Sequence, residues 1–180
     1  MKALLVIDML NDFVRKEGKL YVPGSEEIIP NIKKLKEEFE RRSLPVIYTN
    51  DSHIPGVDKE LQLWGEHAVR GTWGAQVVDE LKPSGRDFVV TKRRYSAFFQ
   101  TDLDLLLREL GVDEVILTGV ATNVCVLHTA ADAYFRGYRV TVVSDGTMSV
   151  PKEEQGRWLD YMKLVYGARI AKAEEIIGEL

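Results

Sequence analysis

Short apolar runs rich in β-branched residues alternate along the chain with segments whose apolar residues recur at helical spacing. Six runs predict strands: Ala3–Ile7, Pro45–Thr49, Phe88–Thr91, Val115–Thr118, Arg139–Val143 and a weaker one at Ala168–Ala171. Most of these runs are nearly continuously apolar rather than alternating, which is typical of strands buried on both faces of a parallel sheet.

The segments between the runs predict helices. Ser25 can cap a helix whose apolar stripe runs from Ile28 to Phe39. Further helices are predicted at Thr101–Leu110, Asn123–Arg136 and Glu153–Tyr166. Alternation of strands and helices favours βαβ units with right-handed crossovers. We therefore expect one α/β domain over residues 1–180, with a three-layer, doubly wound (Rossmann-like), mostly parallel sheet of about six strands and helices on both faces.

Polar residues follow the predicted strands at the points where a doubly wound sheet binds its ligands, beyond the carboxyl ends of the strands. These positions are Asp8, Asn50-Asp51, Lys92, Gly119–Thr122 and Ser144-Asp145. The segment Asp51–Ala75 has weak periodicity and carries Gly, Pro, Trp and two His. Because long loops in compact domains are usually functional, this segment is a second candidate for the site.

Asp8, Lys92 and Cys125 form a chemical set at this end of the sheet. Cys125 stands at the start of a predicted helix, and the helix N-terminus and a nearby ammonium both lower the pKa of a thiol. A carboxylate can take the thiol proton and return it to a leaving amine. Backbone N–H groups of Ala121 and Cys125 can hold an oxyanion. Taken singly, each side chain has a plain structural explanation, as a turn cap, a solvated lysine or a core cysteine.

Composition excludes several classes of function. The net charge of −4 and the pI of about 5.5 offer no basic field for nucleic acid. No apolar run approaches the length of a membrane span, and no signal peptide is evident, so we expect a cytoplasmic protein. The absence of glycine-rich phosphate-binding motifs speaks against the main rival class, a non-catalytic nucleotide-binding or interacting α/β domain.

Three segments, Leu5–Phe13, Lys92–Phe99 and Gly119–Val126, resemble motifs of the isochorismatase-like cysteine hydrolase superfamily, and the likeness covers nearly the whole chain. This superfamily includes nicotinamidases, N-carbamoylsarcosine amidases and ureidoacrylate amidohydrolases. The resemblance implies that Asp8, Lys92 and Cys125 are a catalytic triad and that the Val120–Ala121 peptide is cis. The cysteine implies amide hydrolysis, because the isochorismate-cleaving members lack it. The resemblance also implies self-association, as a homodimer or homotetramer.

Asp51, His53 and His67 are candidate ligands of a metal ion. One carboxylate and two imidazoles suit a metal that keeps open positions, although from the spacing alone metal-free loop histidines are the simpler interpretation. The resemblance to nicotinamidases implies a metal here, with zinc favoured and iron or manganese as alternatives. It also implies that Phe13 and Trp64 line the substrate pocket. A fourth ligand between the histidines is available only from Asp58 or Glu60, so we expect three.

Different parts of the resemblance point to different substrates. Only Arg93 and Arg94 separate Lys92 from the Tyr95-Ser96-Ala97-Phe98 motif, which is more similar to the N-carbamoylsarcosine and ureidoacrylate branches. Arg94 could bind the carboxylate of such substrates, or both arginines could face solvent or pair with Asp102 and Asp104. Tyr95 and Val120 are further candidates for the pocket wall. His128, three residues after Cys125, is expected to be structural. We expect a small-molecule amide, most of all nicotinamide, with the carboxylated amides as the alternative.

Overall fold

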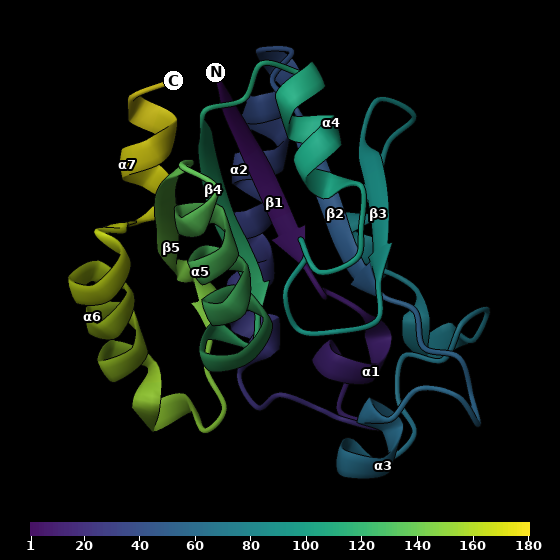
Figure 1. The fold of residues 1–180 in the computed structure, drawn as a ribbon. Helices are drawn as coiled ribbons and strands as arrows, with labels where there is room; N and C mark the ends of the chain where they lie inside the picture. Colours follow the sequence, from purple (N-terminus) through teal and green to yellow (C-terminus); the bar gives the residue numbers. More distant parts are fainter.

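The computed structural model describes residues 1–180, and a six-stranded sheet forms its centre (Figure 1). The strands are β1 (Lys2–Ile7), β2 (Val46–Asp51), β3 (Phe88–Lys92), β4 (Glu114–Val120), β5 (Arg139–Met148) and β6 (Arg169–Ala171). They lie in the order β3-β2-β1-β4-β5-β6, and every neighbouring pair is parallel. The predicted doubly wound parallel sheet is therefore confirmed.

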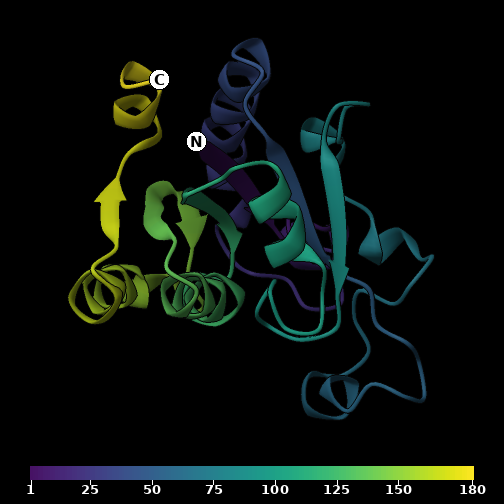
Figure 2. The same cartoon turned by 45° about the horizontal axis from the view of Figure 1, so that its top comes forward.

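Helices cover both faces of the sheet, as Figure 2 shows. One face packs against α2 (Ile29–Arg41) and α7 (Ala173–Gly178), and the other against α4 (Leu103–Glu109), α5 (Leu127–Phe135) and α6 (Gln155–Tyr166). Leu4 of β1 belongs to the first hydrophobic core and Leu5 to the second. Because a strand points successive side chains to opposite faces, β1 must be apolar throughout to fill both cores.

Short elements gather beyond the carboxyl ends of the strands, where Figure 1 shows α1 and α3. They are α1 (Asn11–Val14), α3 (Glu60–Trp64), a π-helical turn (Thr122–Val126) and 3₁₀ turns at Ser25–Ile28, Trp73–Ala75, Asp79–Leu81 and Lys152–Glu154. The sequence did not predict α1, α3 or α7, each of which is six residues or shorter. The helix expected at Asn123–Arg136 begins instead with the π-helical turn.

Strand β5 runs five residues further than predicted, through the polar stretch Ser144–Gly146 to Met148. The pairing of β4 with β5 shifts register after Leu117 and resumes where Gly119 faces Thr147. This irregularity accommodates polar residues that a continuous buried strand would exclude. The shift lies at the end of β4 from which the segment carrying Cys125 departs.

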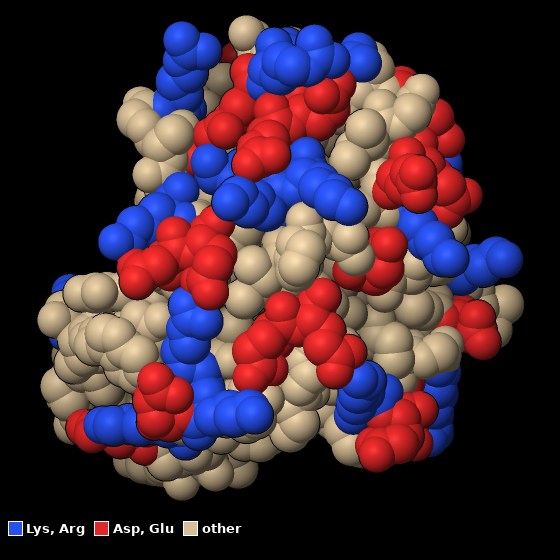
Figure 3. Space-filling model, turned by 180° about the vertical axis from the view of Figure 1, so that it is seen from behind, with Lys and Arg blue, Asp and Glu red and all other residues tan.

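The face of the molecule turned away from the viewer in Figure 1 carries acidic and basic side chains in small mixed groups (Figure 3). On α2, Glu38 pairs with Arg41 and with Arg42, the residue directly after the helix, and Lys36 pairs with Glu40. These pairs join residues three or four apart on one helix, which is the spacing at which helical side chains meet. None of the helices has the length and apolar character needed to cross a membrane.

Candidate active site

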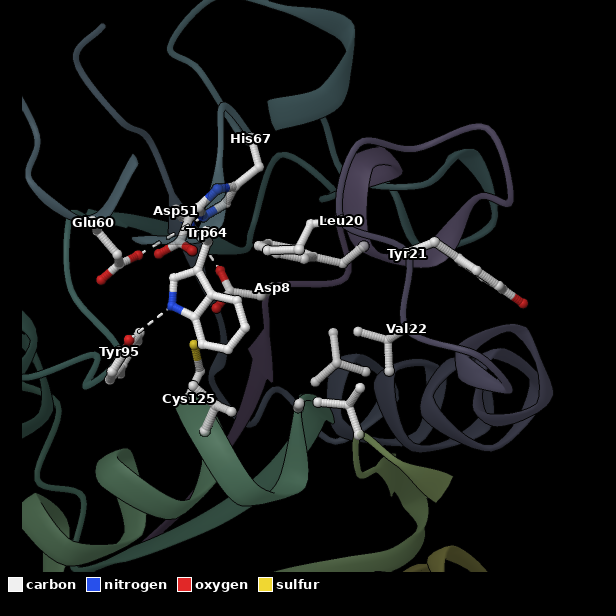
Figure 4. Close-up of a pocket in the computed structure, with 15 residues that line it drawn as sticks. Asp8, Leu20, Tyr21, Val22, Asp51, Glu60, Trp64, His67, Tyr95 and Cys125 are labelled. Atoms are coloured by element: carbon white, nitrogen blue, oxygen red, sulfur yellow. Dashed lines mark hydrogen bonds and ion pairs between the residues drawn. The ribbon is translucent and has the colours of Figure 1, made fainter. Parts of the chain in front are cut away.

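The carboxyl ends of four neighbouring strands bring the candidate residues together (Figure 4). Asp8 directly follows β1, and Cys125 lies in the π-helical turn that follows β4. Asp51 and Lys92 are the last residues of β2 and β3. The strand order reverses between β1 and β4, and this switch point is where doubly wound sheets bind ligands.

Lys92 forms the hub of the predicted triad. Its Nζ lies 2.8 Å from Asp8 Oδ2, donates to Asp51 Oδ1 at 2.7 Å and to Cys125 Sγ at 3.5 Å. The lysine side chain has no exposed surface. A buried ammonium is tolerated because two carboxylates surround it. The structure thus brings Asp8, Lys92 and Cys125 into contact, and it adds Asp51 to them.

Burial and charge set the protonation of these groups. Burial raises the pKa of Asp8 to about 6, and the Asp51 carboxylate adds to this shift. Burial lowers the pKa of Lys92, but the two carboxylates outweigh it and hold that pKa well above its usual range. Burial also raises the pKa of the Cys125 thiol, more than the Lys92 ammonium lowers it. The expectation of a lowered thiol pKa is therefore wrong, because it ignored desolvation.

Cys125 is consequently a thiol near neutral pH, and Asp8 is an ionised carboxylate that can receive its proton. Asp8 Oδ1 accepts the Asp51 N–H at 2.8 Å, whereas buried Asp8 Oδ2 has no hydrogen bond of normal geometry. Lys92 Nζ lies 2.8 Å from Oδ2, and the second lone pair of Oδ2 is the acceptor that a general base requires.

The backbone at the end of β4 runs very close to β1. Gly119 has φ of 106°, and a Cβ at this position would lie 1.9 Å from Ile7 O. Only glycine fits here. The next peptide, Val120–Ala121, is cis, as the resemblance implied. Val120, Ala121 and Cys125 all line the cavity, so the backbone proposed to hold the oxyanion adjoins the thiol.

The cavity above Cys125 is mainly apolar. Of its 15 lining residues, 11 are hydrophobic, and among them are the predicted Phe13, Trp64 and Tyr95. Trp64 Nε1 donates to Tyr95 Oη at 2.9 Å, and Figure 4 shows this contact, with the indole next to the sulfur of Cys125 in this view. The other lining residues are Asp8, Asp51, Glu60 and His67, so no lysine or arginine side chain lines the cavity.

Both arginines after Lys92 point elsewhere. Arg94 does not line the cavity; its guanidinium donates to Arg93 O, and its own carbonyl accepts from Lys92 Nζ at 3.0 Å. Arg93 donates to Asp58 Oδ1 through Nε at 2.8 Å and through a terminal nitrogen. Arg93 therefore pairs with an acid, but the acid is Asp58 and not the expected Asp102 or Asp104. His128 is also outside the cavity, with Nδ1 2.6 Å from Val124 O.

Next to the triad, Asp51, His53 and His67 converge, and Glu60 joins them. Each of the four offers one donor atom, and these atoms lie within 4.8 Å of one another. All four residues are buried. His53 Nδ1 lies 3.0 Å from Asp58 Oδ2 and His67 Nδ1 lies 2.7 Å from Gly65 O. Each Nδ1–H thus has an acceptor, which leaves both Nε2 atoms free to bind.

These four residues fit a divalent metal ion. His53 Nε2 is buried without a hydrogen-bond partner, 3.1 Å from Glu60 Oε2 and 3.5 Å from Asp51 Oδ2. Two imidazoles and two carboxylates, with outer oxygen atoms that orient the imidazoles, are the donor set that zinc and related ions take. The structure therefore offers one candidate ligand more than the three expected. The additional candidate is Glu60, on the first turn of α3.

No sequence pattern placed Leu20, Tyr21, Val22 and Val150 in the lining, and Val124 was marked only as part of the Gly119–Val126 motif. Three of them come from the irregular segment between α1 and the first 3₁₀ turn, whose position depends on tertiary contacts. Asp12 supplies one such contact: its carboxylate accepts the N–H of Lys19 at 3.1 Å and of Ala68 at 2.9 Å. It thereby ties the Leu20–Val22 segment to the loop that carries His67.

The profile of the isochorismatase domain matches residues 2–175. The chain belongs to the isochorismatase family. This isochorismatase-family hydrolase is similar to solved structures that carry different activities in their names. N-carbamoylsarcosine amidase from Thermoplasma acidophilum is 42% identical with a TM-score of 0.89, and the match covers 96% of each chain.

Two further structures are nicotinamidase or pyrazinamidase enzymes. Pyrazinamidase/nicotinamidase from Streptococcus mutans UA159 is 37% identical, with a TM-score of 0.89 over 94% of this chain and 99% of that one. Pyrazinamidase of Pyrococcus horikoshii, solved in complex with zinc, is 32% identical, with a TM-score of 0.87 over 95% and 98%. These matches show that the protein is an isochorismatase-family hydrolase. They do not identify its substrate.

Proposed function

We propose that this hydrolase is a cysteine amidohydrolase that releases ammonia from a small neutral aromatic amide, above all nicotinamide, which would give nicotinate. The observation that carries the proposal is the cavity: its wall is mainly apolar, and no lysine or arginine side chain lines it. A planar uncharged ring can bury its surface there, whereas a carboxylated substrate would meet Asp8, Asp51 and Glu60 without a matching cation from the chain.

Formation of the covalent intermediate follows from the contacts of Cys125. Asp8 Oδ2 takes the thiol proton while the Lys92 ammonium stabilises the thiolate 3.5 Å away. The sulfur attacks the amide carbonyl carbon, and backbone N–H groups of Ala121 and Cys125 hold the oxyanion. Asp8 then gives its proton to the amide nitrogen, the C–N bond breaks, and ammonia leaves a thioester on Cys125.

Hydrolysis of the thioester reverses these proton transfers. Asp8, again a carboxylate, takes a proton from water as the water oxygen attacks the thioester carbonyl carbon. The C–S bond breaks, Asp8 returns the proton to sulfur, and the carboxylic acid product leaves. The pKa of about 6 for Asp8 suits both directions, because the group exchanges protons readily near neutral pH.

Asp51, His53, Glu60 and His67 would hold one divalent ion, which we propose to be zinc, with iron or manganese as alternatives. Such an ion supplies a Lewis acid that can bind water or a ring nitrogen of the substrate and so orient the amide. Asp51 accepts from Lys92 through Oδ1 and directs Oδ2 toward His53. This side chain therefore ties the ligand set to the triad.

Parallel measurements of ammonia release test the proposal, with nicotinamide, N-carbamoylsarcosine and ureidoacrylate as substrates, each before and after metal chelation. We expect kcat/KM to be highest for nicotinamide and to fall on chelation. Cys125→Ala serves as the background control. Release from the two carboxylated substrates alone, unaffected by chelation, would contradict both the substrate and the metal assignment.

The alternative substrate class has one observation in its favour. The similarity to N-carbamoylsarcosine amidase, at 42% identity, is higher than that to either nicotinamidase-type structure named above. A carboxylated carbamoyl substrate would need a cation for its carboxylate, and a metal ion held by the chain could serve. On this alternative, Arg94→Ala should reduce activity more than His53→Ala, and the position of Arg94 outside the cavity argues against that outcome.

A further inference from the structure

Arg93, the residue after Lys92, pairs with a buried carboxylate instead of facing the cavity. It leaves the cavity free and donates to Asp58 Oδ1 through Nε at 2.8 Å and through a terminal nitrogen. The Asp58 side chain has no exposed surface, although the arginine side chain is 45% exposed. A buried carboxylate needs such a partner, because an uncompensated charge is costly to bury.

Asp58 uses its other oxygen to fix the candidate ligand His53. Asp58 Oδ2 lies 3.0 Å from His53 Nδ1 and also accepts the Ile54 N–H at 3.0 Å. The ring of His53 is fully buried, and its Nε2 faces Glu60 and Asp51 without a hydrogen bond. Nδ1 donates to the carboxylate in this arrangement, which leaves Nε2 as the lone pair that can bind a cation.

We propose that Arg93 is a positioning residue for the metal site, acting through Asp58 on the orientation of His53. The inference rests on the metal site of the proposed function and adds a residue that is neither a ligand nor in contact with the substrate. Arg93 directly follows Lys92, the last residue of β3. Two successive side chains therefore serve the two parts of the site: Lys92 contacts the triad, and Arg93 supports the ligand set.

Positioning and plain electrostatics predict opposite effects on metal affinity. Removing a positive charge near the site should strengthen the binding of a cation if charge alone mattered. Removing Arg93 as a support instead leaves Asp58 Oδ1 buried without its donors, so the carboxylate turns or the loop moves and His53 loses its orientation. Loss of the outer-shell partner of a ligand, here Asp58, weakens metal binding by about 10- to 100-fold, and loss of Arg93 acts through that partner.

The experiment measures Zn²⁺ affinity of the full chain by competition with a chromophoric chelator, without any substrate. Arg93→Ala should weaken binding about 10-fold. Arg94→Ala is the matched control, because it removes the same charge from the same loop but makes no contact with Asp58. We expect its affinity to equal that of the wild type or to be slightly higher. The visible spectrum of bound Co²⁺ should change in Arg93→Ala and stay unchanged in Arg94→Ala.

A double-mutant cycle tests the route through Asp58. Asp58→Ala should weaken Zn²⁺ binding at least as much as Arg93→Ala, and the double variant should lose no more than Asp58→Ala alone. Arg93→Gln repeats the comparison if the alanine variant does not fold. Equal Zn²⁺ affinities and Co²⁺ spectra for the Arg93 and Arg94 variants would overturn the inference alone, whereas a wild type that binds no Zn²⁺ would overturn the proposed metal site as well.

Discussion

Replacing Lys92 by methionine removes the ammonium that neutralises two buried carboxylates. Its Nζ lies 2.8 Å from Asp8 Oδ2 and 2.7 Å from Asp51 Oδ1, and all three side chains are at most 3% exposed. Breaking a buried ion pair costs about 3–5 kcal/mol of unfolding free energy, and each kcal/mol lowers Tm by about 2–4 °C in a chain of this size. We therefore expect Tm of the metal-free variant to fall by about 6–20 °C.

The fall in Tm of Lys92→Met should be larger at high pH than at low pH. The folded-state pKa of Asp8 is already raised to about 6 from 3.8, and removal of the ammonium should raise it further. A group with a raised folded-state pKa favours folding below its unfolded-state pKa, and that contribution is lost as pH rises through the folded-state value. The deficit of Lys92→Met should therefore be large at pH 8 and smaller at pH 5.

The assay is thermal unfolding by circular dichroism of chelator-treated protein at pH 5, 6.5 and 8. Lys33→Met, which removes an exposed lysine from α2, is the matched control and should shift Tm by little. A Lys92→Met deficit of less than about 2 °C at pH 8, or one that grows as the pH falls, would refute the account of Lys92 as the charge that stabilises Asp8 and Asp51.

Three further measurements probe the site. Cys125→Ala should abolish turnover and leave the circular dichroism spectrum unchanged, because alanine fits the same space; retained activity would exclude the thioester. In metal-free protein, the rate of Cys125 alkylation should rise through pH of about 6, as Asp8 ionises, and Asp8→Asn should remove this rise; a rise only at alkaline pH in both would exclude Asp8 as the base. Glu60→Gln should weaken Zn²⁺ binding about 10-fold or more, whereas the exposed Glu66→Gln should not, and equal affinities would remove Glu60 from the ligand set.

The centre of the sheet could be predicted because β1, β2 and β4 are buried on both faces. Residues Ala3–Ile7 have no exposed surface, and such a strand has to be apolar without interruption. Once parallel strands are assigned, their carboxyl ends must lie at one edge, so Asp8 and Lys92 could be placed near each other before any coordinates. The short helices could not be predicted, because their stability comes from packing rather than from a periodic pattern.

The parts of the site that depend on the path of a loop were beyond sequence reasoning. Glu60 and Asp58 were both possible fourth ligands, two positions apart, and only the turn between β2 and α3 decides between them. It places Asp58 between Arg93 and His53 Nδ1, and it places Glu60 at His53 Nε2. The thiol pKa was also misjudged, because the degree of burial that dominates it is a tertiary property.

Asp51 contacts both the metal-ligand set and the triad. One carboxylate oxygen accepts from Lys92 at 2.7 Å, and the other lies 3.5 Å from His53 Nε2, while its backbone N–H donates to Asp8. A cation at the ligand set would draw electron density from the same carboxylate that stabilises the Lys92 ammonium. Lys92 would then depend more on Asp8 for its counter-charge, which lowers the pKa of Asp8. Metal binding should therefore move the pH dependence of Cys125 alkylation to lower pH, even though Cys125 is not one of the four candidate ligands.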